Sequence, residues 1–269
     1  MPETPADTRP AAPRSDRRAL RTVLRWTCAA LVFLAVGTAT AYGITGMERT
    51  DVPGLATEPD GRWSYPELTM PPLPSGSPAP FAEGNTAGAH HADLRELLLP
   101  APRGSEPDPA LRGEDGWLAT EDFAAEYEGE RDRERLVQLL EDHGVRHIAA
   151  RGWTAQDGTR SRVYLLHFDT AAVADEVYSE ELTRRRSVQY ELRGVDDGAG
   201  YDAAFPTDHE LYELEINPFV EDRPHGAEQV RHAYVLAGDV LAVIVQSRKG
   251  TAPALPFQQT VILQSQLLG

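Results

Sequence analysis

Hydrophobic and polar positions divide the chain into four parts. Between Arg25 and Glu48 no residue is charged, and residues 28–36 are continuously apolar. A helix of about 20 uncharged residues is long enough to cross a bilayer core of about 30 Å. The pattern therefore predicts a cytoplasmic tail (residues 1–25), a transmembrane anchor (26–46), a linker (47–91) and an extracytoplasmic domain (92–269).

The domain alternates between helical and strand periods. Strand-like runs cover residues 145–153, 160–168, 211–216, 230–237 and 240–247. Helical periods cover residues 94–98, a helix starting at Thr120, 132–142, 170–184 and a last helix starting at Pro256. The Asp157-Gly158 and Gly238-Asp239 pairs are typical of hairpin turns. The residues expected to share one core are Leu140, Val163, Leu165, Val177, Val243, Val245 and Val261.

Two segments of the domain begin alike. Val145-Arg146-His147 and Val230-Arg231-His232 each open a predicted series of strand, hairpin, strand and helix. We therefore expect an α+β fold in which two ββα units form one antiparallel sheet with flanking helices on one face.

That repeat predicts a ligand site. If the units are related, His147 and His232 lie on one face of the sheet, with Trp153 and Tyr234 nearby. Aromatic rings supply contact area and histidine supplies a polar group, so these four residues are the candidate binding residues. The alternative is that each histidine only satisfies a backbone carbonyl group.

The linker is rich in proline, which blocks helices and sheet ladders, so an extended spacer is expected. Trp63, Tyr65 and Phe81 interrupt it. These aromatic residues either dock onto the domain or lie exposed in the linker.

Charge indicates the orientation in the membrane. Residues 1–25 hold six arginines against three acidic residues, a surplus of three positive charges. This bias predicts a cytoplasmic N-terminus and an exported domain bound to the plasma membrane through residues 26–46. Ala39-Thr40-Ala41 also fits a signal-peptidase site, and cleavage there would release a secreted protein that begins at Tyr42. Because the whole chain has a net charge of −16, the part after Arg25 carries −19, which argues against nucleic-acid binding.

No stretch carries a catalytic or cofactor motif. Cys28 is the only cysteine, so a domain outside the membrane has no disulfide, no cysteine nucleophile and no cysteine-bound metal. His90-His91-x-Asp93 offers imidazole and carboxylate groups, but the spacing fixes no third ligand, so no metal is expected there. The clustered acidic residues lack the spacing of a calcium loop and indicate a solvated surface.

The chain resembles uncharacterised membrane-anchored or secreted envelope proteins of actinobacteria in its Pro71–Gly76 spacer, its Ala92–Pro100 block and its C-terminal Phe257–Gly269 segment. More loosely, it is similar to extracytoplasmic sensor-type α+β domains. The resemblance supplies no catalytic residues, and our first interpretation is a single-pass envelope module that binds a ligand, an envelope protein or the cell wall, without catalysis. The alternative is an envelope hydrolase whose histidine and carboxylate site is assembled only by the fold.

Overall fold

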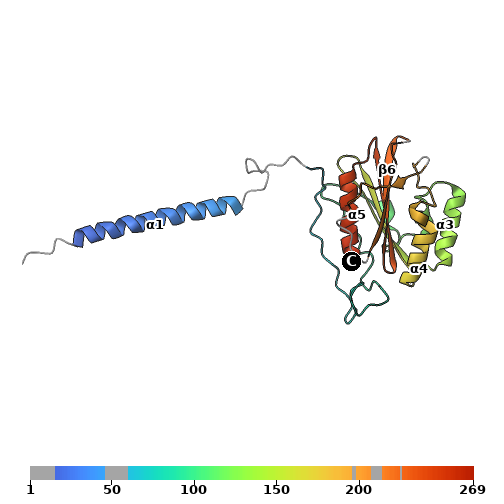
Figure 1. Ribbon diagram of the computed structural model, residues 1–269, viewed down its shortest axis with the longest axis horizontal. Coiled ribbons are helices and arrows are strands. Elements are labelled where there is room, and N and C mark those ends of the chain that lie inside the picture. The colour runs from blue at the N-terminus through green and yellow to red at the C-terminus, as the bar shows by residue number, and fades with distance from the viewer. Residues whose placement is uncertain (1–15, 46–59, 196–197, 207–213, 225) are drawn as a thin grey trace, which may run out of the picture. The chain divides into compact units, whose positions relative to one another are not determined.

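The computed structural model describes residues 16–45, 60–195, 198–206, 214–224 and 226–269 (Figure 1). The chain divides into two units, one ending at Asp60 and the other comprising Gly61–Gly269. Most of the predicted cytoplasmic tail and the first part of the predicted linker lie outside the described residues.

The first unit contains the helix α1 (Asp16–Thr45), which begins ten residues before the predicted span of 26–46. Its segment Leu20–Thr38 is long and apolar enough to cross a membrane, and a signal sequence near the N-terminus has the same properties. The apolar stretch thus lies earlier than predicted. The reason is that apolar residues already alternate with Arg21 and Arg25, whereas glycine and threonine dilute the second half of the helix.

Threonine hydroxyl groups in α1 bond to the helix itself. The Thr27 hydroxyl donates to the carbonyl oxygen of Val23 at 2.9 Å, and Thr40 donates to Val36 at 2.7 Å. Such bonds let a polar side chain lie in a lipid-facing helix without an unsatisfied donor. Phe33 is 85% exposed within the chain, and the Leu20–Thr38 segment is not buried against other described residues.

The second unit is built on a seven-stranded sheet with the order β1-β2-β3-β7-β6-β5-β4, in which all neighbours are antiparallel. The strands are β1 (Glu106–Asp108), β2 (His147–Thr154), β3 (Arg160–His167), β4 (Gly200–Tyr201), β5 (Glu215–Val220), β6 (Glu228–Ala237) and β7 (Val240–Lys249). Both predicted hairpins are confirmed. Of the strand predicted over 211–216, residues 211–213 lie outside the described residues, and β5 begins at Glu215.

Helices cover both faces of the sheet (Figure 1). They are η2 (Pro109–Arg112), α2 (Thr120–Ala124), α3 (Glu130–Asp142), α4 (Ala171–Glu176), the π-helical turn η3 (Val177–Leu182), η4 (Arg184–Arg186) and α5 (Ala254–Leu268). We call the side covered by α2, α3 and α4 the α3 face, and the side covered by α5 and residues 61–99 the α5 face. The predicted helix over 94–98 is wrong, because that segment forms turns.

Each face has its own hydrophobic core. All seven predicted core residues are at most 1% exposed, which confirms their burial. They do not form one cluster, however: Val163, Leu165 and Val261 lie on the α5 face, and the other four lie on the α3 face. Coverage of both faces explains why residues 240–245 of β7 are continuously apolar.

The structure does not support the repeat of two ββα units. The two hairpins lie side by side, and a twofold axis perpendicular to the sheet could relate them. Such an axis keeps each helix on the same face, yet α4 packs on the α3 face through Ala174, whereas α5 packs on the α5 face through Phe257. The expectation of helices on one face is therefore wrong.

Residues 61–91, which we call the strap, belong to the compact unit and not to a free linker. Trp63, Tyr65 and Phe81 pack against the core of the α5 face, so the docking alternative is confirmed. The Gln259 side chain accepts from the backbone nitrogen of Trp63 at 2.8 Å and donates to its carbonyl oxygen at 2.9 Å. One amide side chain thus satisfies both backbone groups of Trp63. The compact unit begins at Gly61 and not at the predicted boundary, residue 92.

Candidate functional site

The register places His147 and His232 on opposite faces of the sheet. His147 pairs with His167, which pairs with Val240 of β7, whereas His232 pairs with Val245 of the same strand. Residues an odd number of positions apart on a strand point to opposite faces. Val240 and Val245 are five apart, so the two imidazole rings are on different sides.

Trp153 and Tyr234 are separated in the same way. Trp153 belongs to the core of the α5 face and is 1% exposed, and Tyr234 is fully buried in the core of the α3 face. The four residues predicted as one ligand site therefore do not share a surface. The sequence could not show this, because the register between two hairpins depends on contacts distant in the chain.

His232 is a core residue. Its ring stacks on Phe219 with centroids 5.0 Å apart and meets Tyr234 edge-on. Neither ring nitrogen has a hydrogen-bond partner among the described residues. Burial favours the uncharged ring and lowers the pKa of His232 to about 3. A ring enclosed in this way cannot reach a ligand.

His147, in contrast, is exposed and lies in a groove at one end of the sheet. Its ring stacks on Trp117 with centroids 4.4 Å apart and an interplanar angle of 28°. The guanidinium carbon of Arg95 lies 4.8 Å from the Trp117 ring centre, and Asp93 holds Arg95 through a hydrogen bond of 2.9 Å from Nε. Trp117 is thus fixed between two neighbours.

We call this space the imidazole groove. It has a volume of about 550 Å³ and is open to solvent. Its walls are residues 72–74 of the strap, residues 91–94, Glu96, Trp117, His147 and His167. Three histidines therefore line the groove with Trp117: His147 and His167, which pair across the β2–β3 hairpin, and His91 from the end of the strap.

Asp239 holds one side of the groove in place. His167 Nε2 lies 3.1 Å from Asp239 Oδ2, and His90 Nδ1 lies 2.8 Å from Oδ1. Burial by itself raises the pKa of Asp239, but the hydrogen bonds from His167 and His90 outweigh it and hold that pKa well below its usual range. The carboxylate orients His167 and fastens the strap to the β6–β7 turn.

The same turn requires glycine. Gly238 has a φ of +53°, and a Cβ atom there would lie 2.0 Å from the carbonyl oxygen of Gly88. The turn and the end of the strap are therefore in direct backbone contact.

The His90-His91-x-Asp93 motif does not form a metal site. His90 is buried, with its second ring nitrogen, Nε2, 2.9 Å from the carbonyl oxygen of Leu268, and Asp93 is bound to Arg95. Among the residues that the structure describes, no group of three or more His, Cys, Asp or Glu side chains is placed to hold a metal ion.

Sequence reasoning identified His147 but missed Trp117 and the role of Asp239. The Gly238-Asp239 pair was interpreted only as a turn, although an acidic residue in a tight turn can also bind neighbouring segments. The predicted hairpin around Asp157-Gly158 pairs His147 with His167, but no local pattern brings residues 91 and 117 to them. Comparison with protein-family models finds no match for this chain, and comparison with curated proteins finds none either.

Proposed function

We propose that the chain is an exported binding module, tethered to the plasma membrane by a single helix, which binds a saccharide unit of an envelope polymer in the imidazole groove without catalysis. The observation that carries the proposal is the exposed His147 ring stacked on Trp117 beside two further histidines.

The location is inferred from α1 and from the arginines before it and in its N-terminal part. The helix holds a stretch apolar enough to cross a membrane, and basic residues on the N-terminal side favour a cytoplasmic N-terminus. Signal cleavage near Ala41 is the alternative, and it would release the same domain. A reporter that is active only outside the cytoplasm, fused after Gly269, tests the orientation.

The groove chemistry favours a neutral, hydroxyl-rich ligand. The exposed His147 ring, supported from behind by Trp117, offers a flat surface for the C–H face of a sugar, while imidazole and carboxylate groups pair with hydroxyl groups. Pro72, Leu73 and Leu94 add apolar wall, and Asp93 and Glu96 add acceptors. Mixed apolar and polar walls of this kind are typical of small-ligand sites.

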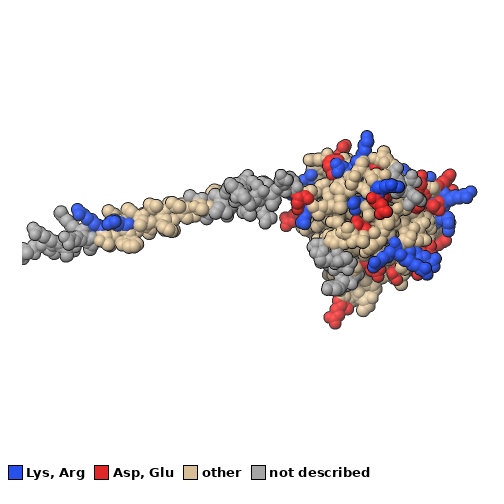
Figure 2. All heavy atoms as spheres, turned by 45° about the horizontal axis from the view of Figure 1, so that its top comes forward, with Lys and Arg blue, Asp and Glu red and all other residues tan. Residues whose placement is uncertain are grey.

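The charge of the domain argues against an anionic polymer as the main partner. On the face shown in Figure 2, acidic and basic side chains are interspersed. With the part after Arg25 at −19, a polyanion such as nucleic acid is repelled at long range. A neutral saccharide is not repelled in this way.

The test is a titration of the protein with soluble saccharide fragments of the cell envelope, followed by tryptophan fluorescence. We expect saturable quenching that His147→Ala weakens about tenfold, since a ring contact contributes about 0.5–1.5 kcal/mol and its hydrogen bond is lost too. His143→Ala, on a ring that bonds to the Leu139 carbonyl outside the groove, is the matched control. Equal effects of both variants, or no saturation, would contradict the proposal.

One observation favours a hydrolase as the second candidate. The His167 ring lines the groove and is paired with Asp239, an arrangement that could activate a water molecule. Analysis of the same saccharide fragments for cleavage products distinguishes the two functions. Products that disappear in His167→Ala would establish hydrolysis in place of simple binding.

A further inference from the structure

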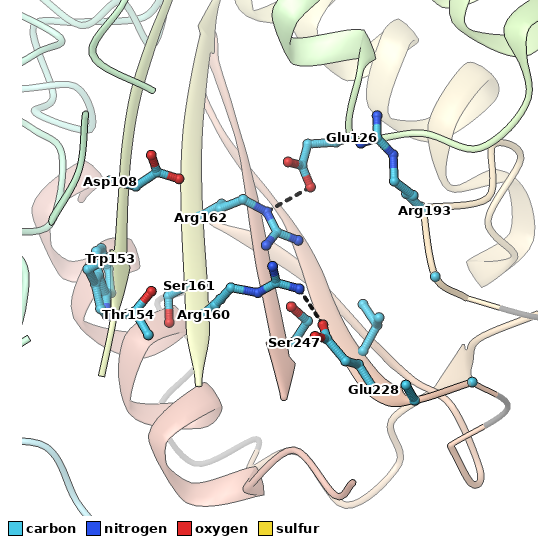
Figure 3. A pocket seen from close by; sticks show the side chains of 14 residues that line it. Asp108, Glu126, Trp153, Thr154, Arg160, Ser161, Arg162, Arg193, Glu228 and Ser247 are labelled. Carbon is cyan, nitrogen blue, oxygen red and sulfur yellow. Dashed lines mark hydrogen bonds and ion pairs between the residues drawn. The ribbon is translucent and has the colours of Figure 1, made fainter. Parts of the chain in front are cut away.

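A second groove, of about 530 Å³, lies mainly on the α3 face near the turn between β2 and β3 (Figure 3). Arg160 and Arg162 are two residues apart on β3, so their side chains point to the same face. Ser247 of β7 pairs with Arg160 and therefore lies on that face as well. We call this space the arginine groove. It is separate from the imidazole groove, and the inference from it goes beyond the proposed function.

Two carboxylates hold the arginines in position. Arg162 Nε donates to Glu126 Oε2 at 2.8 Å, and both side chains are 17% exposed. Arg160 donates to Glu228 through Nη2. A guanidinium group has five N–H donors. Each arginine therefore has four N–H groups left, and these have no other hydrogen-bond partner among the described residues.

The remaining N–H groups of Arg160 and Arg162 lie close together, and none of them has an acceptor among the described residues. Figure 3 shows the guanidinium groups of Arg160 and Arg162 turned toward each other, with Ser247 beside Arg160. The Ser247 hydroxyl is buried, with 3% of the residue exposed, and has no partner in the part of the chain that the structure describes. Both arginine charges are already paired with carboxylates, but an oxyanion between the two guanidinium groups would accept their remaining N–H groups and the Ser247 hydroxyl.

The other charges of the groove restrict that anion. Arg193 donates to the carbonyl oxygen of Ala125 and adds a third positive charge. Asp108, which accepts from the backbone nitrogen of Ala110 at 3.0 Å, faces the groove with Glu126 and Glu228. Three positive and three negative groups balance, so the groove has no net charge to attract a multiply charged anion, and binding depends on directed hydrogen bonds from the arginines.

We propose that the arginine groove binds the carboxylate group of a small organic acid or of a peptide C-terminus. A planar carboxylate matches the fork of a guanidinium group, and the second guanidinium and the Ser247 hydroxyl supply further donors. Glu126 and Glu228 act as positioning residues that keep both arginines extended toward the ligand.

The test uses the full chain in lipid nanodiscs and two matched probes, N-acetylglycine and its uncharged amide. The arginine Nε–H signals are followed by NMR. We expect N-acetylglycine to shift the Arg160 and Arg162 signals saturably and the amide to leave them in place. In Arg160→Gln the affinity should fall about tenfold or more, because charge-assisted hydrogen bonds are lost. Arg135→Gln, on an exposed arginine of α3, should bind as the unchanged chain does.

Several outcomes would overturn the proposal. These are equal shifts with the amide, equal loss in Arg135→Gln, or absence of saturable shifts in the unchanged chain. Inorganic phosphate that binds as tightly as N-acetylglycine would show a general oxyanion site instead. Because Arg162→Gln leaves Glu126 without its partner, the double variant Arg162→Gln/Glu126→Gln is the second test, and it too should lose binding.

Discussion

The two faces of the sheet use the same residue type in opposite ways. On the α3 face, His232 is enclosed by Phe219 and Tyr234 and has no hydrogen-bond partner in the described part of the chain. On the α5 face, His147 lies in an open groove against Trp117. The difference comes from the covering layer and not from the local sequence. Phe219 and Tyr234 enclose His232 within the α3 face, whereas the layer on the α5 face leaves the imidazole groove open.

A charge in the core of the α3 face should have the largest effect on stability. Val243→Asp places a charge on the α3 face where the native side chain is 1% exposed. An unpaired buried charge costs several kcal/mol, so we expect the domain to unfold, which circular dichroism can detect. Leu73→Asp introduces the same charge at a groove residue that is 38% exposed, and it should leave the melting temperature nearly unchanged. Similar melting temperatures of Val243→Asp and Leu73→Asp would contradict the described difference between the closed core and the open groove.

Loss of the contacts that hold the strap should have the second-largest effect on stability. His90→Ala removes the ring contacts with Asp239 and with the Leu268 carbonyl but keeps the bond from the backbone nitrogen of residue 90 to Asp239, and loss of a buried paired group costs about 3 kcal/mol. We expect a lower free energy of unfolding in denaturant and faster proteolysis within residues 61–91. The neighbouring His91→Ala is the control, because His91 is exposed. A strap that stays protected in His90→Ala would contradict the assigned role of Asp239.

The free energy of unfolding, measured at several pH values, tests the enclosure of His232. Its pKa of about 3 lies below the ordinary value of about 6.5, so between these values the unfolded chain binds a proton that the folded chain does not. The free energy of unfolding should therefore fall as pH decreases from 6.5, by up to about 1.4 kcal/mol per pH unit, or about 2 kcal/mol at pH 5. His232→Phe should remove this part of the slope.

Tyr234→Phe is the control for that series, because it alters the same ring cluster without removing the histidine. Denaturant unfolding at several pH values gives the slopes. An unchanged slope in His232→Phe would show that the folded protein admits a proton at this ring.

Local patterns predicted the elements of the fold better than their arrangement. The Asp157-Gly158 turn, α3 and the apolar run of β7 are each determined by neighbouring residues, and all three are present as expected. The docking of the strap was not predicted as such, because its proline content describes backbone preference and its partner Gln259 lies almost 200 residues away. The prediction that His147 and His232 share a site was wrong for a related reason. The register between the two hairpins decides which face of the sheet each side chain lies on.

The site was predictable only in part. His147 was selected through the Val-Arg-His repeat, and that repeat is not supported by the structure. Trp117 lies in a loop without periodicity, and Asp239 was explained fully by its turn. Convergence of these residues depends on long-range contacts that no spacing encodes.

The most direct test of the account is a histidine-selective NMR titration of the full chain with envelope saccharide fragments. The account predicts that the ring signals of His91, His147 and His167 shift saturably, with one dissociation constant, while the signal of His232 stays in place. Shifts at His232, or a saturable titration that leaves all three groove histidines unchanged, would contradict it.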